Sequence, residues 1–337
     1  MTKKILVTGA SGFIASHTII ELLSHGYDVR GTVRDLDRAD QLKKILAKHS
    51  DRAHEIELVQ ASLLEKDCWR RAVAGCDSVL HIASPVILED PINADDVILP
   101  AKIGTLNVLE AAFAEGINKV VMTSSVAAVA GHAHATDRVQ SEKDWTDLKY
   151  DNVSAYAQSK TIAERAAWQY ANSKQNFELV TINPSMVLGP ALEADYGTSL
   201  EAILKLMRGD VPLVPKLGFG IVDVRDVASL HRIAMESDQA SGQRLLCSKD
   251  FVWFKKIALQ LRAEFPSYKS KIPRYPMPNM LVRFAGLFDK VIASIIPDLN
   301  KVVQYDCSPA HALGWNARST EEAIFSGAQS LVDFKIV

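Results

Sequence analysis

The sequence predicts an α/β protein with a doubly wound parallel sheet and a smaller, mostly helical lobe toward the C-terminus. Short β-branched runs alternate with longer helical patterns through the first half of the chain, as in successive βαβ units. A glycine-rich turn follows the first of these runs. After residue 184 the pattern loosens into loops rich in proline and glycine and apolar helical stretches. We therefore expect a ligand beyond the carboxyl ends of the strands.

The individual elements follow from the same periodicity. Strands are expected at residues 4–8, 28–33, 55–59, 78–82, 119–123 and 178–182. Helices are expected at residues 12–25, 37–48, 64–74, 94–115 and 154–173. A late strand-helix unit over residues 221–236 should return to the sheet. Residues 1–185 with 219–247 are thus assigned to the sheet domain, and 186–218 with 248–337 mainly to the second lobe.

Composition restricts the class of protein. Of 337 residues, 48% are apolar and 23% charged, as in a folded soluble protein. Lys and Arg number 38 against 40 Asp and Glu, so no basic surface is expected for nucleic acid or an anionic membrane. The four cysteines lack metal-ligand spacing and predict reduced thiols without a metal site. With neither a signal-peptide pattern nor about 18 uninterrupted apolar residues, we expect a cytoplasmic protein.

The turn after the first strand reads Gly9-Ala10-Ser11-Gly12-Phe13-Ile14-Ala15 and opens a helix. Gly9 permits a tight turn, Gly12 lets backbone N–H groups approach a pyrophosphate, and Ala15 allows the helix to pack closely on the sheet. At the first strand of a βαβ series this pattern predicts a Rossmann-type dinucleotide site. Its expected contacts are Gly9, Ser11, Gly12, Phe13 and Ile14.

The end of the second strand indicates which dinucleotide binds. NAD-preferring sites commonly place an acid here, about 20 residues after the glycines, to accept the ribose hydroxyls. Val33 occupies that position and Arg34 follows, where its cation could bind an adenosine 2′-phosphate. NADP(H) is therefore favoured, while the adjacent Asp35 keeps NAD open.

Tyr156 and Lys160 begin the helix at residues 154–173. Their i,i+4 spacing places the phenol and the ammonium on one helical face. A phenol has an unperturbed pKa of about 10, and a neighbouring cation stabilises its anion, which suits proton transfer near neutral pH. The serine pair Ser124 and Ser125 follows the fifth strand, where one hydroxyl could hold a substrate carbonyl oxygen. We expect the Ser124 hydroxyl to form a hydrogen bond with a backbone group left unpaired at the end of the strand.

Together these features resemble the extended short-chain dehydrogenase/reductase superfamily, whose pattern combines TGxxGxxA, a strand-end serine and YxxxK. Further segments resemble its dihydroflavonol reductase-like branch, which includes aldehyde and ketone reductases. These segments are residues 31–35, 75–77, 81–85, 183–190, 223–228 and 313–315. The resemblance implies a catalytic triad of Ser125, Tyr156 and Lys160, with Arg34 at the 2′-phosphate. Further cofactor contacts would be Ser62, Leu63, Ala83, Ser84, Pro184 and Val187.

Two positions depart from relatives of that superfamily. Ser62 stands where many have an Asp that binds the adenine amino group, so at best it makes a weaker contact. Ala101 stands where sugar-nucleotide epimerases often have an Asn, and its presence argues against that activity. An NAD-retaining sugar-nucleotide epimerase or dehydratase nevertheless remains the alternative enzyme. A nonenzymatic dinucleotide sensor is the other alternative.

The function predicted is NADPH-dependent reduction of an aldehyde or ketone, with Tyr156 as proton donor. Apolar side chains in the loose segments, such as Phe284 and Phe288, predict a hydrophobic or aromatic carbonyl substrate. His132 and His134 are candidate substrate contacts. Asp223 and Asp226 are expected to be structural, with Asp226 capping a helix.

Overall fold

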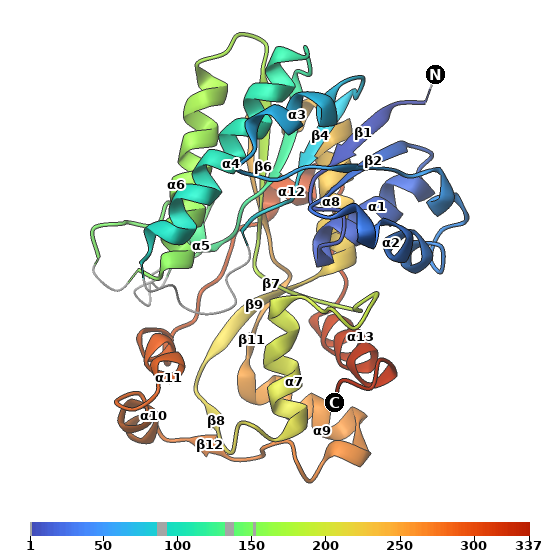
Figure 1. Ribbon diagram of the computed structural model, residues 1–337. Helices are drawn as coiled ribbons and strands as arrows, with labels where there is room; N and C mark the ends of the chain where they lie inside the picture. The colour runs from blue at the N-terminus through green and yellow to red at the C-terminus, as the bar shows by residue number, and fades with distance from the viewer. Residues whose placement is uncertain (1, 86–92, 132–137, 151–152) are drawn as a thin grey trace.

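The computed structural model describes residues 2–85, 93–131, 138–150 and 153–337, and it contains a seven-stranded sheet with a smaller lobe below it (Figure 1). All neighbouring strands of this sheet are parallel, in the order β10-β6-β5-β4-β1-β2-β3. Its strands are β1 (Lys4–Val7), β2 (Asp28–Val33), β3 (Glu57–Gln60), β4 (Ser78–His81), β5 (Lys119–Thr123), β6 (Glu178–Pro184) and β10 (Arg244–Cys247). The predicted doubly wound sheet is confirmed.

Helices cover both faces of the sheet because its strands are apolar on both sides. Ile5 and Val7 join one buried cluster with α1 and α8, and Leu6 between them joins the cluster under α3, α4 and α6. The first layer holds α1 (Phe13–Ser24), α2 (Ala39–Leu46) and α8 (Val224–Glu236). The second holds α3 (Lys66–Val73), α4 (Asp95–Ala114), α6 (Ala155–Asn172) and the short α5 (Ala127–Ala130).

The second lobe is built on a three-stranded sheet of its own. This sheet has the order β11-β9-β7, with β7 (Met186–Leu188), β9 (Gly218–Asp223) and β11 (Asp250–Trp253). A two-stranded sheet joins β8 (Val214–Pro215) to β12 (Pro276–Met277). The helices of the lobe are α7 (Glu201–Arg208), α9 (Phe254–Glu264), α10 (Asn279–Ala285), α11 (Lys290–Ile295) and α13 (Thr320–Asp333). The short α12 (Ser308–Ala312) packs instead against β10 of the main sheet. Single 3₁₀ turns occupy Leu36–Arg38, Asp51–Glu55, Thr198–Leu200, Asp238–Ala240, Pro266–Tyr268 and Ile296–Asp298.

The late strand-helix unit is divided between the two sheets. Its strand, β9, pairs with β7 and β11 in the lobe, so the expectation that this strand joins the main sheet is wrong. The chain leaves the main sheet at Pro184 and forms β7 two residues later. The strand β9 then pairs with β7 in parallel. Helix α8 then packs against α1, and β10 pairs with β6 as the seventh strand.

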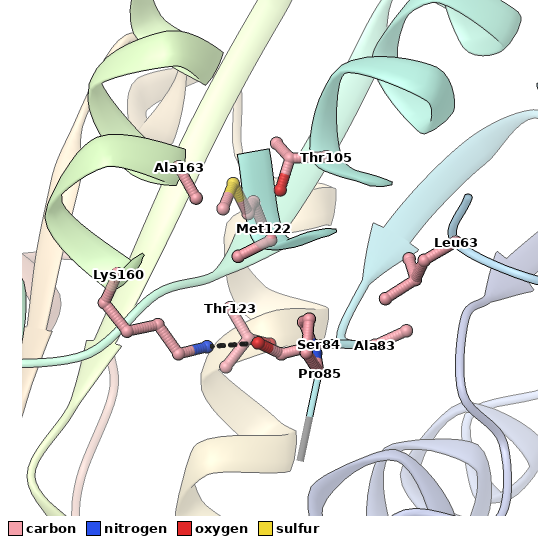
Figure 2. A pocket seen from close by; sticks show the side chains of 10 residues that line it. Leu63, Ala83, Ser84, Pro85, Thr105, Met122, Thr123, Lys160 and Ala163 are labelled. Atoms are coloured by element: carbon pink, nitrogen blue, oxygen red, sulfur yellow. Dashed lines mark hydrogen bonds between the residues drawn. The ribbon is translucent and has the colours of Figure 1, made fainter. Parts of the chain in front are cut away.

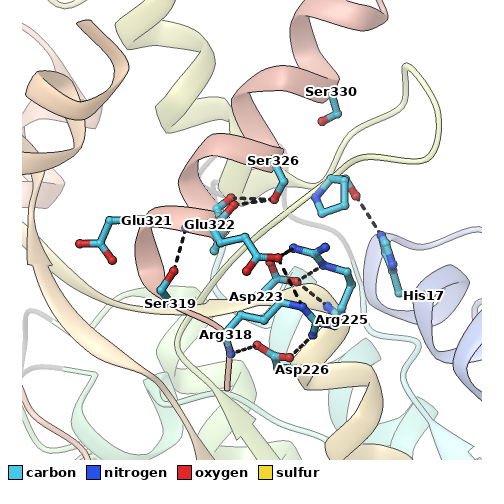
Figure 3. A network of polar contacts seen from close by, with 12 residues as sticks. His17, Asp223, Arg225, Asp226, Arg318, Ser319, Glu321, Glu322, Ser326 and Ser330 are labelled. Atoms are coloured by element: carbon cyan, nitrogen blue, oxygen red, sulfur yellow. Dashed lines mark hydrogen bonds and ion pairs between the residues drawn. The ribbon is translucent and has the colours of Figure 1, made fainter. Parts of the chain in front are cut away.

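A polar network joins the two lobes where α8 begins (Figure 3). Asp223 caps α8 by accepting the Arg225 N–H at 2.8 Å, and it also binds the Arg225 guanidinium. Asp226 instead accepts the backbone N–H of Arg318 at 2.7 Å and pairs with its guanidinium. Arg225 and Arg318 both reach Glu322 on α13. The structural role of both aspartates is as expected, but the cap is Asp223 because it stands at the residue before the first helical turn.

Helix α4 is the one described helix long and apolar enough to cross a membrane, with a mean hydropathy of 1.4 over 18 residues. Over half of that window, 56%, is buried inside the protein, and α4 lies between α3 and α6. This is the packing of a core helix. The four cysteines are free and buried.

Candidate active site

The glycine turn has the geometry that a phosphate-binding turn needs. Gly9 adopts φ +70°, and a Cβ there would lie 3.1 Å from the Cβ of Ala83. Gly12 precedes α1 in extended conformation with no side-chain cap. The first N–H groups of α1 are therefore left for a ligand, and the helix dipole favours an anion there. Ser11, Phe13 and Ile14 are only partly buried around this turn.

Arg34 is exposed directly after β2, while Val33 at the strand end is buried. A second arginine, Arg38, follows one turn later and pairs with Glu193 and Asp195 at 3.5 Å each. This places acidic residues of the lobe beside the end of β2. No signal in the sequence indicated these two ion pairs, because Glu193 and Asp195 are 155 and 157 positions from Arg38.

The segment after β4 is held by Thr8 at the end of β1. Its hydroxyl oxygen accepts the backbone N–H groups of Ile82 at 3.0 Å and Ala83 at 2.9 Å. The Thr8 hydroxyl proton is thereby directed to His81 Nδ1, 3.0 Å away. Burial, and to a smaller extent the charge of Lys160, lower the pKa of His81 to about 3. His81 is thus neutral beneath the site.

Lys160 extends from α6 toward the end of β4 (Figure 2). Its Nζ donates to Ser84 Oγ at 3.0 Å. The two side chains share a narrow pocket with Leu63, Pro85 and Met122. The remaining lining residues are Ala83, Ala101, Thr105, Thr123 and Ala163. Four of the predicted site residues, Leu63, Ala83, Ser84 and Lys160, are therefore brought together from three segments of the chain.

Tyr156 lies in the first turn of α6 and is 43% exposed, so its phenol is open to a substrate. Ser154 caps the helix by accepting the Ala157 N–H at 3.2 Å. Lys160 Nζ is 5.9 Å from the centroid of the Tyr156 ring. The expected shared face of these two side chains is present.

Ser125 follows β5 at the carboxyl edge of the sheet and is 8% exposed. Its hydroxyl oxygen accepts the Ala127 N–H at 3.1 Å, which leaves the hydroxyl proton to donate elsewhere. The segment after Ser125 packs on the start of α6: a Cβ on Gly131 would lie 2.6 Å from the Cβ of Ala157. Contrary to the expectation, the Ser124 hydroxyl does not bind a backbone group at the end of the strand. It donates a hydrogen bond of 2.5 Å to the buried Glu164 carboxylate.

The other predicted contacts occupy the same edge of the sheet. Pro184 ends β6 and Val187 lies in β7, and both are buried. Ser62 and Leu63 follow β3 and are partly buried. His132 and His134 lie outside the described residues. Within the described ranges, no group of three or more His, Cys, Asp or Glu side chains could hold a metal ion.

A glycine turn at the first helix, an exposed tyrosine beside a buried lysine and a strand-end serine lie at one edge of the sheet. This arrangement is that of a dinucleotide-dependent oxidoreductase. Residues 5–246 match the model of the NAD dependent epimerase/dehydratase family. The chain belongs to this family, and its relatives place it in the dihydroflavonol reductase-like branch of the extended short-chain dehydrogenase/reductases.

Several characterised proteins are similar over most of the chain. Cinnamoyl-CoA reductase CAD2 of Medicago truncatula is 40% identical over 301 residues, which are 84% of this chain and 90% of that protein. Tetraketide alpha-pyrone reductase 1 of Arabidopsis thaliana is 32% identical, over 98% and 95% of the two chains. The NADPH complex of Gre2 from Candida albicans superposes with a TM-score of 0.81 at 30% identity, covering 98% and 99%. Yeast methylglyoxal/isovaleraldehyde reductase Gre2 with NADPH gives a TM-score of 0.82 at 26% identity, with the same coverage.

Proposed function

We propose that this protein reduces an aldehyde or ketone to an alcohol with NADPH. The observation that carries the proposal is the placement of Ser125, Tyr156 and Lys160 at the sheet edge that also bears the glycine turn. The names of relatives support it, because they are reductases, and two of the similar structures contain NADPH.

The residues present fit NADP(H). The Gly9 and Gly12 turn leaves α1 uncapped for a diphosphate, and Arg34 is exposed where a 2′-phosphate would be recognised. Ser11, Phe13 and Ile14 would hold the dinucleotide at this turn. Bound NADPH would supply the hydride.

Ser62 and Leu63 would contact the dinucleotide after β3, and Ala83 and Ser84 after β4. Pro184 and Val187 would contact it after β6. Five of these six residues follow or end strands at the carboxyl edge of the main sheet, where α/β folds bind their ligands, and Val187 lies three residues beyond that edge in β7.

The chemistry of this chain is then proton transfer and charge stabilisation. Ser125 has its proton free to donate to the substrate oxygen, because its own oxygen already accepts the Ala127 N–H. Tyr156 gives its proton to that oxygen as the alcohol forms. Lys160, 5.9 Å from the ring centroid, stabilises the phenolate and has two further N–H donors for ribose hydroxyls.

The substrate class proposed is a hydrophobic or aromatic carbonyl compound. Phe284 and Phe288 are 61% and 79% exposed and stack edge to face, with ring centroids 5.5 Å apart. Met280 and Leu287 extend the same exposed apolar surface at α10. A lobe of this composition is suited to apolar ligands.

The test is the oxidation of NADPH by the purified protein with a panel of aliphatic and aromatic aldehydes and ketones, monitored by NADPH absorbance. Net oxidation with stoichiometric alcohol is expected. Tightly retained NAD after purification, with conversion of a sugar nucleotide and no net NADPH oxidation, would instead support an epimerase. Dinucleotide binding without turnover on any of these substrates would support a sensor.

A further inference from the structure

Glu164 is a fully buried carboxylate on the catalytic helix that takes no part in the proposed chemistry. It lies four residues after Lys160 and eight after Tyr156, so the three side chains share one face of α6. Burial of an ionised carboxylate is unfavourable unless the group is paired and hydrogen-bonded. The partners of Glu164 therefore show which parts of the chain the buried carboxylate holds in place.

One carboxylate oxygen of Glu164 holds the chain on both sides of the Ser124–Ser125 peptide. Its Oε2 accepts the Ser124 hydroxyl at 2.5 Å and Asn183 Nδ2 at 2.8 Å. The same Asn183 nitrogen donates to the backbone carbonyl of Ser125 at 3.1 Å. Glu164 thus fixes the end of β5 relative to α6 and β6.

The other carboxylate oxygen pairs with Arg244 of β10. Arg244 Nε lies 2.6 Å from Glu164 Oε1, and this ion pair is buried on both sides. The Arg244 guanidinium also donates to the carbonyls of Glu142 at 2.6 Å and Asp144 at 2.7 Å. It lies 3.7 Å from the centroid of the Trp145 ring. Arg244 therefore holds the segment that precedes α6.

That segment in turn holds the chain after Ser125. Thr146, next to Trp145, donates its hydroxyl to the carbonyl of Ala127 at 2.7 Å and accepts the Gly131 N–H at 2.7 Å. The Thr146 N–H donates to the carbonyl of Ala128 at 2.9 Å. These contacts fix α5, whose first N–H binds the Ser125 hydroxyl.

We propose that Glu164 and Arg244 are positioning residues, which set the Ser125 hydroxyl against the Tyr156 and Lys160 face of α6. The inference rests on the proposed function, since it assigns these three residues to the reaction. Glu164 acts on Ser124 and, through Asn183, on the carbonyl of Ser125, and Arg244 acts on the chain after Ser125. Proton transfer and oxyanion stabilisation lose efficiency on displacements of about 1 Å, so loss of either anchor lowers turnover more than cofactor binding.

The variants Glu164→Gln and Arg244→Met test this separation. An amide nitrogen in place of Oε2 cannot accept from Asn183, so kcat should fall about tenfold or more while the Kd for NADPH changes less than about twofold. Arg244→Met should have the same effect on kcat. The double variant removes both buried charges and should recover much of the Tm lost by each single variant. Its kcat should stay low, because neither anchor returns.

Asp226→Asn is the matched control. Asp226 is also a buried carboxylate paired with an arginine, but it contacts the lobe junction and none of Ser125, Tyr156 or Lys160. The Asp226→Asn substitution should lower Tm and should leave kcat unchanged at temperatures below the unfolding transition. Where Glu164→Gln does not fold, Ser124→Ala removes one contact of Glu164 and keeps its ion pair with Arg244, and it should lower kcat about threefold or more.

A folded Glu164→Gln or Ser124→Ala protein with the wild-type kcat overturns the inference. So does a double variant in which kcat and Tm recover together. A readout independent of turnover is the ¹³C resonance of the Tyr156 ring, assigned by its absence in Tyr156→Phe. Its chemical shift should change in Glu164→Gln and should keep the wild-type value in Asp226→Asn. The wild-type chemical shift in both variants contradicts the inference. Absence of NADPH oxidation by the wild-type protein overturns the proposed reaction alone.

Discussion

Lys160 Nζ donates a hydrogen bond of 3.0 Å to Ser84 Oγ, although the two residues are 76 positions apart in the chain. The bond joins the catalytic helix α6 to the segment that follows β4. Since Thr8 holds that segment through two backbone N–H groups, the ammonium is fixed relative to the first strand and its glycine turn. One cation is thereby placed for both the tyrosine and the cofactor.

Lys160→Ala should therefore impair two properties together. We expect kcat to fall about 100-fold, because the phenolate loses its cation, and NADPH affinity to fall about tenfold with the loss of charged hydrogen bonds. Steady-state kinetics and fluorescence titration of NADPH measure the two effects. Lys256→Ala, which removes an exposed lysine of the lobe, is the control and should change neither. A loss of affinity with unchanged kcat would restrict Lys160 to cofactor binding.

Tyr156→Phe should separate catalysis from binding. The substitution removes only the phenol oxygen of a 43% exposed side chain, so NADPH binding should be nearly unchanged. Turnover should decrease about 100-fold or more, the scale expected for loss of a positioned acid. Tyr170→Phe, farther along the same helix, provides the comparison. Turnover of Tyr156→Phe within about threefold of wild type would exclude Tyr156 as the proton donor.

Arg34→Ala should weaken NADPH binding about 10- to 100-fold and change NADH binding little, because only NADPH carries the 2′-phosphate. Dissociation constants for both dinucleotides give the ratio directly. Arg70→Ala, another exposed arginine, is the control. An equal loss for both dinucleotides would show that Arg34 does not read the phosphate.

The sequence was sufficient for contacts that are local. The i,i+4 spacing of Tyr156 and Lys160 and the position of the glycine turn determine their geometry once a helix and a βαβ unit are assigned. It was insufficient for contacts that depend on the fold. Glu164 reads as an ordinary helix carboxylate, and only the pairing of β10 with β6 brings Arg244, 80 positions away, to its side.

The sequence also did not determine that β10, and not β9, joins the main sheet, and the reason is similar. Both segments are short apolar runs, and periodicity within a run does not state which sheet receives it. The choice follows from β7, which leads the chain out of the main sheet after Pro184 and offers β9 a parallel partner. The helix α8 begins three residues earlier than a cap at Asp226 requires, so the cap is Asp223 and Asp226 lies in the first turn.

His231 predicts a specific dependence of stability on pH. Its Nε2 lies 2.7 Å from Thr123 Oγ1 and its Nδ1 2.8 Å from the carbonyl of Val227, and burial lowers its pKa to about 4. The unfolded chain binds a proton below about pH 6.5 that the folded protein does not bind until about pH 4. Stability should therefore fall as pH is lowered through this window, with His231 contributing on the order of 3 kcal/mol.

Urea unfolding at several pH values measures this slope. His231→Gln should be less stable at neutral pH but should lose less free energy of unfolding between pH values of about 6.5 and 4, because one proton fewer is bound on unfolding. His54→Gln, which changes a histidine with a 77% exposed side chain, should keep the wild-type slope. Identical slopes in wild type and His231→Gln would show that His231 is not the titrating group.

Substrate selectivity should reside in the second lobe. The catalytic side chains lie on the regular sheet domain, whereas Tyr196 and the exposed pair Phe284 and Phe288 lie on segments of the second lobe. Tyr196 is itself held by Glu201 through a 2.8 Å hydrogen bond, so its position is fixed locally within the lobe. Residues 280–288 can be replaced without touching the glycine turn. Residues 190–200 also contact the turn and α1, since Gly197 packs on Phe13 and the Pro190 carbonyl binds His17.

Exchange of residues 190–200 and 280–288 for those of a relative with different selectivity should reorder a panel of aromatic, aliphatic and charged carbonyl compounds by kcat/KM. The exchange should keep Gly197 against Phe13, and Glu193 and Asp195 against Arg38. The Kd for NADPH should then stay within about threefold, because Arg34 and the Gly9 turn are undisturbed. The double substitution of Phe284 and Phe288 by serine tests the aromatic pair alone. It should reduce kcat/KM for aromatic substrates more than for small aliphatic ones, since it removes apolar contact area. An unchanged order in a folded chimera would place selectivity in residues 127–150, which connect Ser125 to α6.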